Sequence, residues 1–147
     1  MAIKGIQHCA LVVSDLEKSC WFYETVVGLE SIPRPHTFTF AGAWFRGGAS
    51  ELHLIGTNDT TAPAGIGDPG AGRATGLATH LAFEVTDLAE IQARLARHGV
   101  EIVGGPVARG DGFVQIWLLD PDGYMVEFFQ WTKADQPEAP ERGPVRN

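Results

Sequence analysis

The chain has 147 residues, of which 44% are hydrophobic and 20% are charged, and this composition predicts one ordinary globular domain rather than a disordered or fibrous protein. A formal net charge of −7 and the lack of any lysine or arginine cluster argue against a nucleic-acid partner. The N-terminal stretch has no signal-peptide core and no run reaches membrane-spanning length, so we expect a cytoplasmic protein without a membrane partner.

Apolar and polar residues alternate from Ile3 to Val13, which predicts a first strand. Ser14 and Glu17 have the spacing of a capping box, so we expect Ser14 to be the N-cap of a helix that runs to about Val27. Gly28 would end this helix in the left-handed conformation. Three shorter β-forming runs follow, at residues 29–32, 37–45 and 51–55.

Residues 57–77 are rich in Gly, Pro, Ala and Thr and have no periodicity, which is typical of a linker or a long loop. The β-α-β-β-β order then starts again, with Thr86 as the expected N-cap of a second helix and Gly99 as its stop. The elements predicted in this half are strands at 78–85, 101–103, 113–119 and 124–130 and a helix at 88–98.

The two halves begin with related sequences. Residues 7–16 read QHCALVVSDL and residues 79–88 read THLAFEVTDL, so that His8 corresponds to His80 at an offset of 72 (80 − 8 = 72). Internal repetition of this kind indicates two copies of one structural unit. We therefore predict an α+β fold of two βαβββ modules, 3–56 and 78–131, with curled sheets around a central cleft, a linker at 57–77 and a polar tail at 132–147.

Strand alternation predicts which polar side chains face away from the helices. His8, His80 and Glu127 all alternate with apolar neighbours that are expected to pack against a helix. On the last strand of the first module, either His53 or Glu51 meets the same condition. Imidazole nitrogens together with a carboxylate suit a divalent transition metal with positions left open for substrate.

Several motifs resemble the vicinal oxygen chelate superfamily, which contains glyoxalase I, epimerases, extradiol dioxygenases and bleomycin-binding proteins. They are the paired His-x-Ala-x-x-Val-x-Asp-Leu starts, Phe22-Tyr23 followed by Gly28, and the turn at residues 120–124 (DPDGY) before Glu127. The resemblance implies one ligand from the first and one from the last strand of each module. It assigns the metal ligands to His8, His53, His80 and Glu127, with Glu51 replacing His53 if that strand is shifted by two residues.

Glu84 shares the strand face of His80 and is therefore a candidate general base beside a bound substrate. A carboxylate at the rim of the cleft, exposed to water, is the alternative for Glu84. Trp44, Trp117 and Phe129 are candidates to line an apolar pocket, although aromatic residues in strands also form cores.

The resemblance implies a metal-dependent lyase, isomerase or epimerase that chelates adjacent oxygens of a small-molecule substrate and stabilises an enediolate. The cofactor would be a divalent ion (Zn, Ni, Co, Mn or Fe), and Glu127 or Glu84 would move the proton. Glutathione-dependent glyoxalase I fits poorly, because Val12 stands where that enzyme has an arginine that anchors glutathione.

Two alternatives remain open from the sequence. His8, His80 and Glu127 alone resemble the 2-His-1-carboxylate triad of non-haem Fe(II) dioxygenases. A non-enzymatic binding protein of the bleomycin-resistance type is the other. Apolar strand surface in excess of one small core also predicts a homodimer, in which the site can lie within one chain or across the interface.

Overall fold

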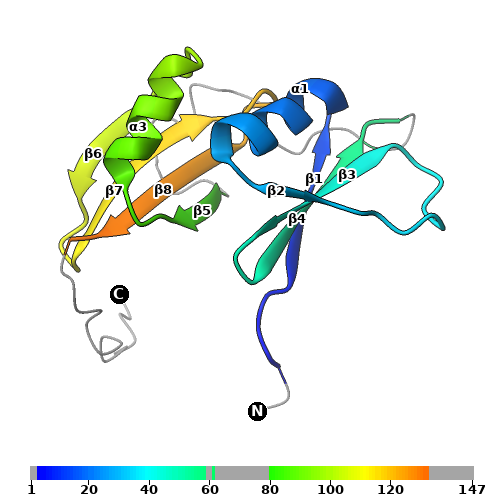
Figure 1. Cartoon of the computed structure of the whole chain (residues 1–147), viewed down its shortest axis with the longest axis horizontal. Coiled ribbons are helices and arrows are strands. Elements are labelled where there is room, and N and C mark those ends of the chain that lie inside the picture. The colour runs from blue at the N-terminus through cyan, green and yellow to red at the C-terminus, as the bar shows by residue number, and fades with distance from the viewer. Residues whose placement is uncertain (1–2, 59–60, 62–79, 133–147) are drawn as a thin grey trace, which may run out of the picture.

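The computed structural model describes residues 3–58, 61 and 80–132, and these fold into two βαβββ modules (Figure 1). The predicted α+β class is therefore correct. Most of the predicted linker and tail lie outside the described residues. The first module consists of β1 (His8–Val13), α1 (Leu16–Trp21), the π-helical segment η1 (Phe22–Val27), β2 (Glu30–Ile32), β3 (Gly42–Gly47) and β4 (Ser50–Gly56). The second consists of β5 (His80–Glu84), α3 (Leu88–Arg97), β6 (Gly104–Ala108), β7 (Phe113–Leu119) and β8 (Met125–Trp131).

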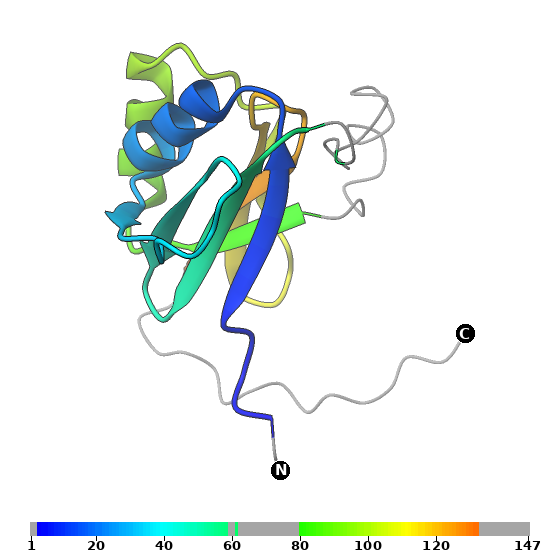
Figure 2. The ribbon, with the colours of Figure 1, turned by 90° about the vertical axis from the view of Figure 1, so that its right-hand side faces the viewer.

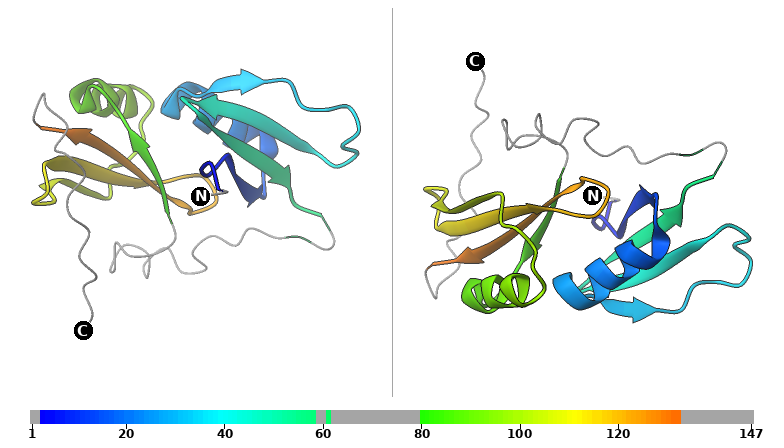
Figure 3. Two further views of the ribbon diagram at one scale, coloured as in Figure 1. Left: turned by 90° about the horizontal axis from the view of Figure 1, so that it is seen from below. Right: turned by 90° about the horizontal axis from the view of Figure 1, so that it is seen from above.

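Each module contains one four-stranded mixed sheet. The strand orders are β1-β4-β3-β2 and β5-β8-β7-β6, with the first and last strands of each module parallel and the other pairs antiparallel. β1 and β5 are therefore edge strands, and both lie toward the middle of the molecule (Figure 3). The two sheets stay separate, so they do not close into one continuous surface within the chain.

The helix N-caps differ from the predicted residues by one position. Asp15 and Asp87, not Ser14 and Thr86, each accept a hydrogen bond from the backbone N–H three residues further on, at 3.1 and 3.0 Å. A carboxylate is favoured here because it caps an orphan N–H and also complements the positive end of the helix. The helix stops are confirmed, since Gly28 has φ 88° and Gly99 has φ 67°.

Three strands begin later than their residue types suggest. β1 starts at His8 rather than Ile3, because its ladder partner β4 begins at Ser50 and offers no earlier residue to pair with. β3 starts at Gly42 rather than at residue 37, because Phe38 lies in the preceding loop, edge-on to Trp44, instead of joining the ladder. β6 occupies 104–108 rather than 101–103, since its first ladder partner is on β7 opposite Gly104.

Both helices cover the same side of the two sheets, and the strands form the opposite side (Figure 2). Alternate strand residues pack beneath the helices, as Leu11 and Val13 do in β1, while His8 and Ala10 face the other way and are exposed. Throughout this article, the outer face of a sheet is the face turned away from the helices. In the described part of the chain no helix has the length and apolar character that a membrane span requires.

The turn between β7 and β8 joins the second module to the first. Asp120 is 5% exposed, and its carboxylate accepts hydrogen bonds from the hydroxyl of buried Tyr23 (2.8 Å) and from the backbone N–H of Tyr124 (2.8 Å). The Tyr124 hydroxyl donates to the Val12 carbonyl at 2.9 Å, at the end of β1. Asp122 accepts from the backbone N–H of Ser14. These contacts connect the turn to the junction of β1 and α1.

Substitution of Tyr23 by Phe should lower the free energy of unfolding by roughly 1–3 kcal/mol, because it leaves the buried Asp120 carboxylate without one donor. Urea titration followed by circular dichroism measures this change. Ser14→Ala is the matched control, since the hydrogen bond that it removes, from the Ser14 hydroxyl to Asp122, is exposed, and its effect should be smaller. Equal losses for the two variants would contradict the importance of the buried contact.

Burial raises the pKa of Asp120, against the opposing hydrogen bond from Tyr23. The folded protein therefore holds this proton more tightly than the unfolded chain, whose aspartate pKa is near 3.8. The stability contributed by this group is greatest below that pKa and is lost as the pH rises through the higher folded value. The unfolding free energy of the wild type, relative to Asp120→Asn, should thus fall between pH 3.5 and pH 7, roughly the range around a carboxyl pKa. A difference that rises or stays constant over this range would exclude the linkage.

Candidate functional site

Two histidines of the first module lie together on its outer face. The parallel ladder pairs Ala10 with His53, so the ring of His53 lies beside that of His8, with ring centroids 4.3 Å apart and planes inclined by 15°. Trp44, the partner of His53 on β3, stacks on the opposite side at 4.0 Å and 5°. His53 is therefore held between two rings and only 12% of its side chain is exposed.

Glu51 is hydrogen-bonded to His53 and precedes it by two residues on β4, on the same face of the sheet. His53 Nε2 lies 3.0 Å from Glu51 Oε2, and Arg46 donates to the other carboxylate oxygen at 3.3 Å. The hydrogen bond from His53, followed by those from Gln7 and Arg46, lowers the pKa of Glu51 to about 2. A carboxylate that receives one ring N–H of a histidine leaves the other nitrogen for a metal, which is the usual outer partner of a histidine ligand.

The second module brings together His80 and Glu127. His80 Nε2 lies 3.3 Å from Glu127 Oε2, and the indole Nε1–H of Trp117 donates to the same oxygen at 3.3 Å. Only 7% of the Glu127 side chain is exposed, whereas 33% of the His80 side chain is. The carboxylate is thus held in a fixed position while the imidazole beside it stays accessible.

The repeat extends to these contacts. In each module one row across the sheet contains an alanine of the first strand, the candidate ligand of the last strand and a tryptophan of the neighbouring strand. His53 has the row position of Glu127, whereas Glu51 is paired with His8 and lies one row away. The equivalence supports His53 as the fourth-ligand candidate. The two rows are Ala10, His53 and Trp44, and Ala82, Glu127 and Trp117.

The two pairs of candidate ligands, His8 with His53 and His80 with Glu127, are called the half-sets below. They do not meet within the chain. His8 and His80 line one cleft of about 850 Å³ between the modules, together with Glu51 and Glu84. Among the described residues, however, no group of three or more His, Cys, Asp or Glu side chains is close enough to hold a metal ion. Parallel rings 4.3 Å apart also cannot both bind one ion in their planes, so His8 or His53 must turn before both can ligate it. The four-ligand assignment stays a prediction.

Glu84 lies where alternation placed it. It is exposed at the end of β5, on the outer face, and its ladder partner is Phe129. It lines the same cleft as His80, one row beyond Ala82. This position suits either a general base or a rim carboxylate, so its catalytic role also stays a prediction.

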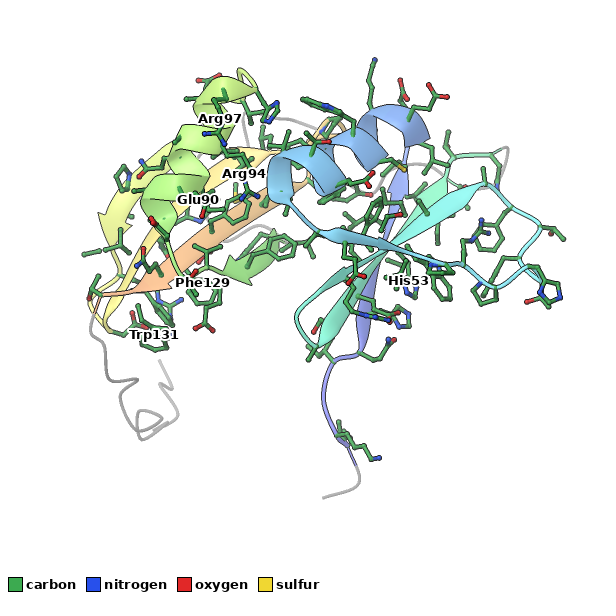
Figure 4. The ribbon with its side chains drawn as sticks, viewed as in Figure 1. His53, Glu90, Arg94, Arg97, Phe129 and Trp131 are labelled. Carbon is green, nitrogen blue, oxygen red and sulfur yellow. The ribbon has the colours of Figure 1, made fainter. Side chains whose placement is uncertain are left out.

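The contacts of two tryptophans with the candidate ligands do not follow from the sequence. Trp44 and Trp117 are candidates to line an apolar pocket or to join the core, and in the structure each contacts a candidate ligand directly. The position of Gln115 could have been found from the sequence, because the alternation of residues 113–117 places it on the outer face with Phe113 and Trp117. Figure 4 shows Phe129 and Trp131 projecting from β8 away from α3, and His53 on the corresponding side of the first module.

This architecture, with paired candidate ligands on the first and last strands of two βαβββ modules, defines a two-module α+β fold class. Residues 5–128 match the Glyoxalase/Bleomycin resistance protein/Dioxygenase superfamily, and the chain belongs to that family.

Sequence and structure comparisons agree with this membership. A lactoylglutathione lyase of Neisseria meningitidis is 32% identical over 136 residues, which cover 87% of this chain and 91% of that protein. A protein named glyoxylase I 4, from Arabidopsis thaliana, is 27% identical over 85% of this chain and 70% of its own length. The crystal structure of a glyoxalase/dioxygenase from Nostoc punctiforme has a TM-score of 0.73 at 25% identity, covering 90% of this chain and 94% of that one.

Proposed function

We propose that the protein is a metal-dependent lyase, isomerase or epimerase of the glyoxalase type, acting on a small substrate with two adjacent oxygens. The observation that carries this proposal is the repeated pair of candidate ligands, His8 with His53 and His80 with Glu127, at equivalent positions of the two sheets. Relatives named as lactoylglutathione lyases support the reaction type.

The donor types fit a divalent ion, since three imidazoles and one carboxylate are ligands that Zn, Ni, Co, Mn and Fe accept. His8, His53, His80 and Glu127 would hold it once the two half-sets are brought together. When bound, the ion would supply Lewis acidity to the chelated oxygens and lower the pKa of the adjacent C–H.

The chain's own residues would position the substrate and move its proton. Trp117 fixes one oxygen of the buried Glu127 carboxylate, so this group stays aligned while the proton is transferred. Glu84 lines the same cleft as His80 and is the second candidate for the base. Exclusion of water by the tryptophans of the two rows would strengthen these electrostatic interactions.

The substrate need not contain glutathione. Val12 lies on the outer face, paired with Ile55, and this apolar pair offers no cation for a glutathione carboxylate. We therefore place the substrate among compounds with vicinal oxygens and leave the hemithioacetal of glutathione as the less favoured choice.

A homodimer would complete the site. Each chain presents two half-sets, and the edge strands β1 and β5 have one side without a ladder partner in the described structure. Edge strands of this kind invite pairing with a second chain. A two-fold arrangement that placed the first module of one chain opposite the second module of its partner would bring both half-sets together twice.

A ring-cleaving dioxygenase is the second candidate, and one observation favours it. Of the three candidate histidines, His53 is the one sandwiched between two rings and bonded to Glu51, so its ring has the least freedom to turn toward an ion. Without it, His8, His80 and Glu127 would form the triad that non-haem iron uses.

Metal analysis of protein purified without chelator tests the proposal. Nickel, cobalt, zinc or manganese at about one ion per chain is expected for the lyase or isomerase, since each complete shell uses one set of four ligands. Iron would instead favour the dioxygenase, and no metal binding at all would overturn both proposals in favour of a binding protein.

His8→Ala and His80→Ala should each abolish metal binding in calorimetric titration, because each removes a ligand from a different half-set. A mixture of the two variants, refolded together, should recover a fraction of intact centres if the site is shared between chains. Light scattering gives the mass of each sample. A monomer with full metal affinity would exclude the shared site.

His53→Ala should weaken metal binding by about 10-fold or more beyond Glu51→Gln, since loss of an outer partner typically costs 10–100-fold and loss of a ligand costs more. Glu51→Gln is the matched control, because it keeps the shape of the side chain that hydrogen-bonds to His53. The reverse order would show that Glu51 is the ligand and that the last strand of the module is used two residues earlier.

A further inference from the structure

The outer face of the second module continues beyond Glu127 into an aromatic patch, defined here as Phe113, Gln115, Phe129 and Trp131. The ring of Phe113 lies 4.6 Å from that of Phe129 and 3.6 Å from that of Trp131. None of the four belongs to the core cluster under the helices. Phe129 and Trp131 are half-buried, so the patch has both enclosed and accessible rings.

Gln115 places an unused hydrogen-bonding group in this patch. The residue is 8% exposed, and its Oε1 atom is buried with no hydrogen-bond partner among the described residues. The ladder pairs Gln115 with Phe129, and strand alternation puts it on the face of Trp117 and Phe113. Buried amide oxygens are nearly always paired because an unpaired one is costly, so an oxygen without a donor indicates a site completed by something else.

We propose that the aromatic patch is a subsite for an aryl group of the substrate, and that Gln115 Oε1 accepts a hydrogen bond from a hydroxyl on that aryl ring. The inference rests on the proposed function and specifies its substrate class: an aryl compound with two adjacent oxygens at one end and a phenolic hydroxyl at the other. Rotation about the last torsion of Gln115, which is soft, turns the oxygen to a donor that enters between the rings.

Distance supports this assignment. Phe129 follows Glu127 by two residues on β8, a rise of about 6–7 Å along the strand. A phenyl ring with a two-carbon headgroup has about this length, so its adjacent oxygens lie near His80 and Glu127 while its ring reaches Phe129. Edge-on and tilted contacts of the kind already present in the patch are those that favour an added aromatic ring.

Charge also selects a neutral ring. Arg109 lies over the ring of Phe113 at 4.5 Å, but its guanidinium is paired with Asp111 in a salt bridge. The cation is therefore already neutralised, and the described residues around the patch offer no free counter-ion to a carboxylate at the far end of the ligand. A hydroxyl donor fits the Gln115 oxygen, whereas a second carboxylate does not.

Three α-hydroxy acids test the subsite: lactate, mandelate and 4-hydroxymandelate. They share the adjacent oxygens and differ by the aryl ring and then by one phenolic hydroxyl. Calorimetric titration of the full-length protein should give mandelate at least about tenfold tighter binding than lactate, from burial of the ring. The hydroxyl should add about five- to tenfold through one hydrogen bond.

Gln115→Leu should remove the advantage of 4-hydroxymandelate over mandelate and leave the advantage of mandelate over lactate. Gln115→Met repeats the test with a flexible side chain, in case the branched one perturbs the strand. Gln92→Leu, on α3 and remote from the outer face, is the matched control and should change neither ratio. Trp131→Ala should reduce the preference for an aryl ring whether residue 115 is the native Gln or is replaced by Leu or Met.

Equal binding of the three acids, or an unchanged hydroxyl advantage in both Gln115 variants, would overturn the subsite. Metal bound normally in that case would leave the proposed function intact. In the reverse result, the protein selects aryl ligands after chelator treatment and the untreated protein binds no metal. This result would support the subsite and exclude the metal-dependent reaction. A Trp131→Ala protein with a changed mass in light scattering and unchanged ligand ratios would show that the patch is an interface between copies.

Discussion

The buried hydrogen bond between Tyr23 and Asp120 is the contact on which the arrangement of the two modules depends. It connects residues 97 positions apart and is reinforced by the Tyr124 hydroxyl at the end of β1. A buried carboxylate needs several donors, and these donors come from both modules, so a rotation of one module against the other would remove the Tyr23 donor from Asp120. Arg94 adds a further bond across the boundary to the Val27 carbonyl. Together these contacts hold the helices side by side and direct both outer faces away from them.

The repeat explains why the candidate pairs could be predicted. The first and last strands of each module are parallel neighbours, so the residues that point away from the helix on both strands lie on one face of the sheet. The alternation of polar and apolar residues in the sequence reveals which residues these are. His8 with His53 and His80 with Glu127 follow from this rule. Whether the pairs meet does not follow from it, since their separation is set by the bonds of Asp120 and Tyr23. No periodicity in the sequence encodes the packing of one module against another.

The smaller errors have the same origin in partners that the local sequence does not reveal. Ser14 satisfies the pattern of an N-cap, but its backbone N–H and hydroxyl are used by Asp122 of the other module, and Asp15 caps the helix. Phe38 has strand propensity but lies in a loop, where its ring meets that of Trp44 edge-on. Gln115 was overlooked because a glutamine in an apolar strand carries no motif, and its unpaired oxygen becomes visible only when its neighbours are placed around it. Local pattern gives the face of a residue, whereas its partners are a property of the assembled fold.

Duplication of the module has produced a symmetric scaffold with an asymmetric lining, and the differences bear on how a substrate would be oriented. At the row beyond the candidate ligands, Val12 and Ile55 in the first module correspond to Glu84 and Phe129 in the second. The first is wholly apolar, whereas the second combines a carboxylate, an aromatic ring and the Gln115 oxygen. If the two half-sets face each other across a dimer, an enclosed ligand finds the carboxylate, aromatic ring and amide oxygen of this row on one wall only. Its adjacent oxygens can then be shared by both walls while its remaining atoms are selected by the second module, which separates the common chemistry of the fold from the specificity of this chain.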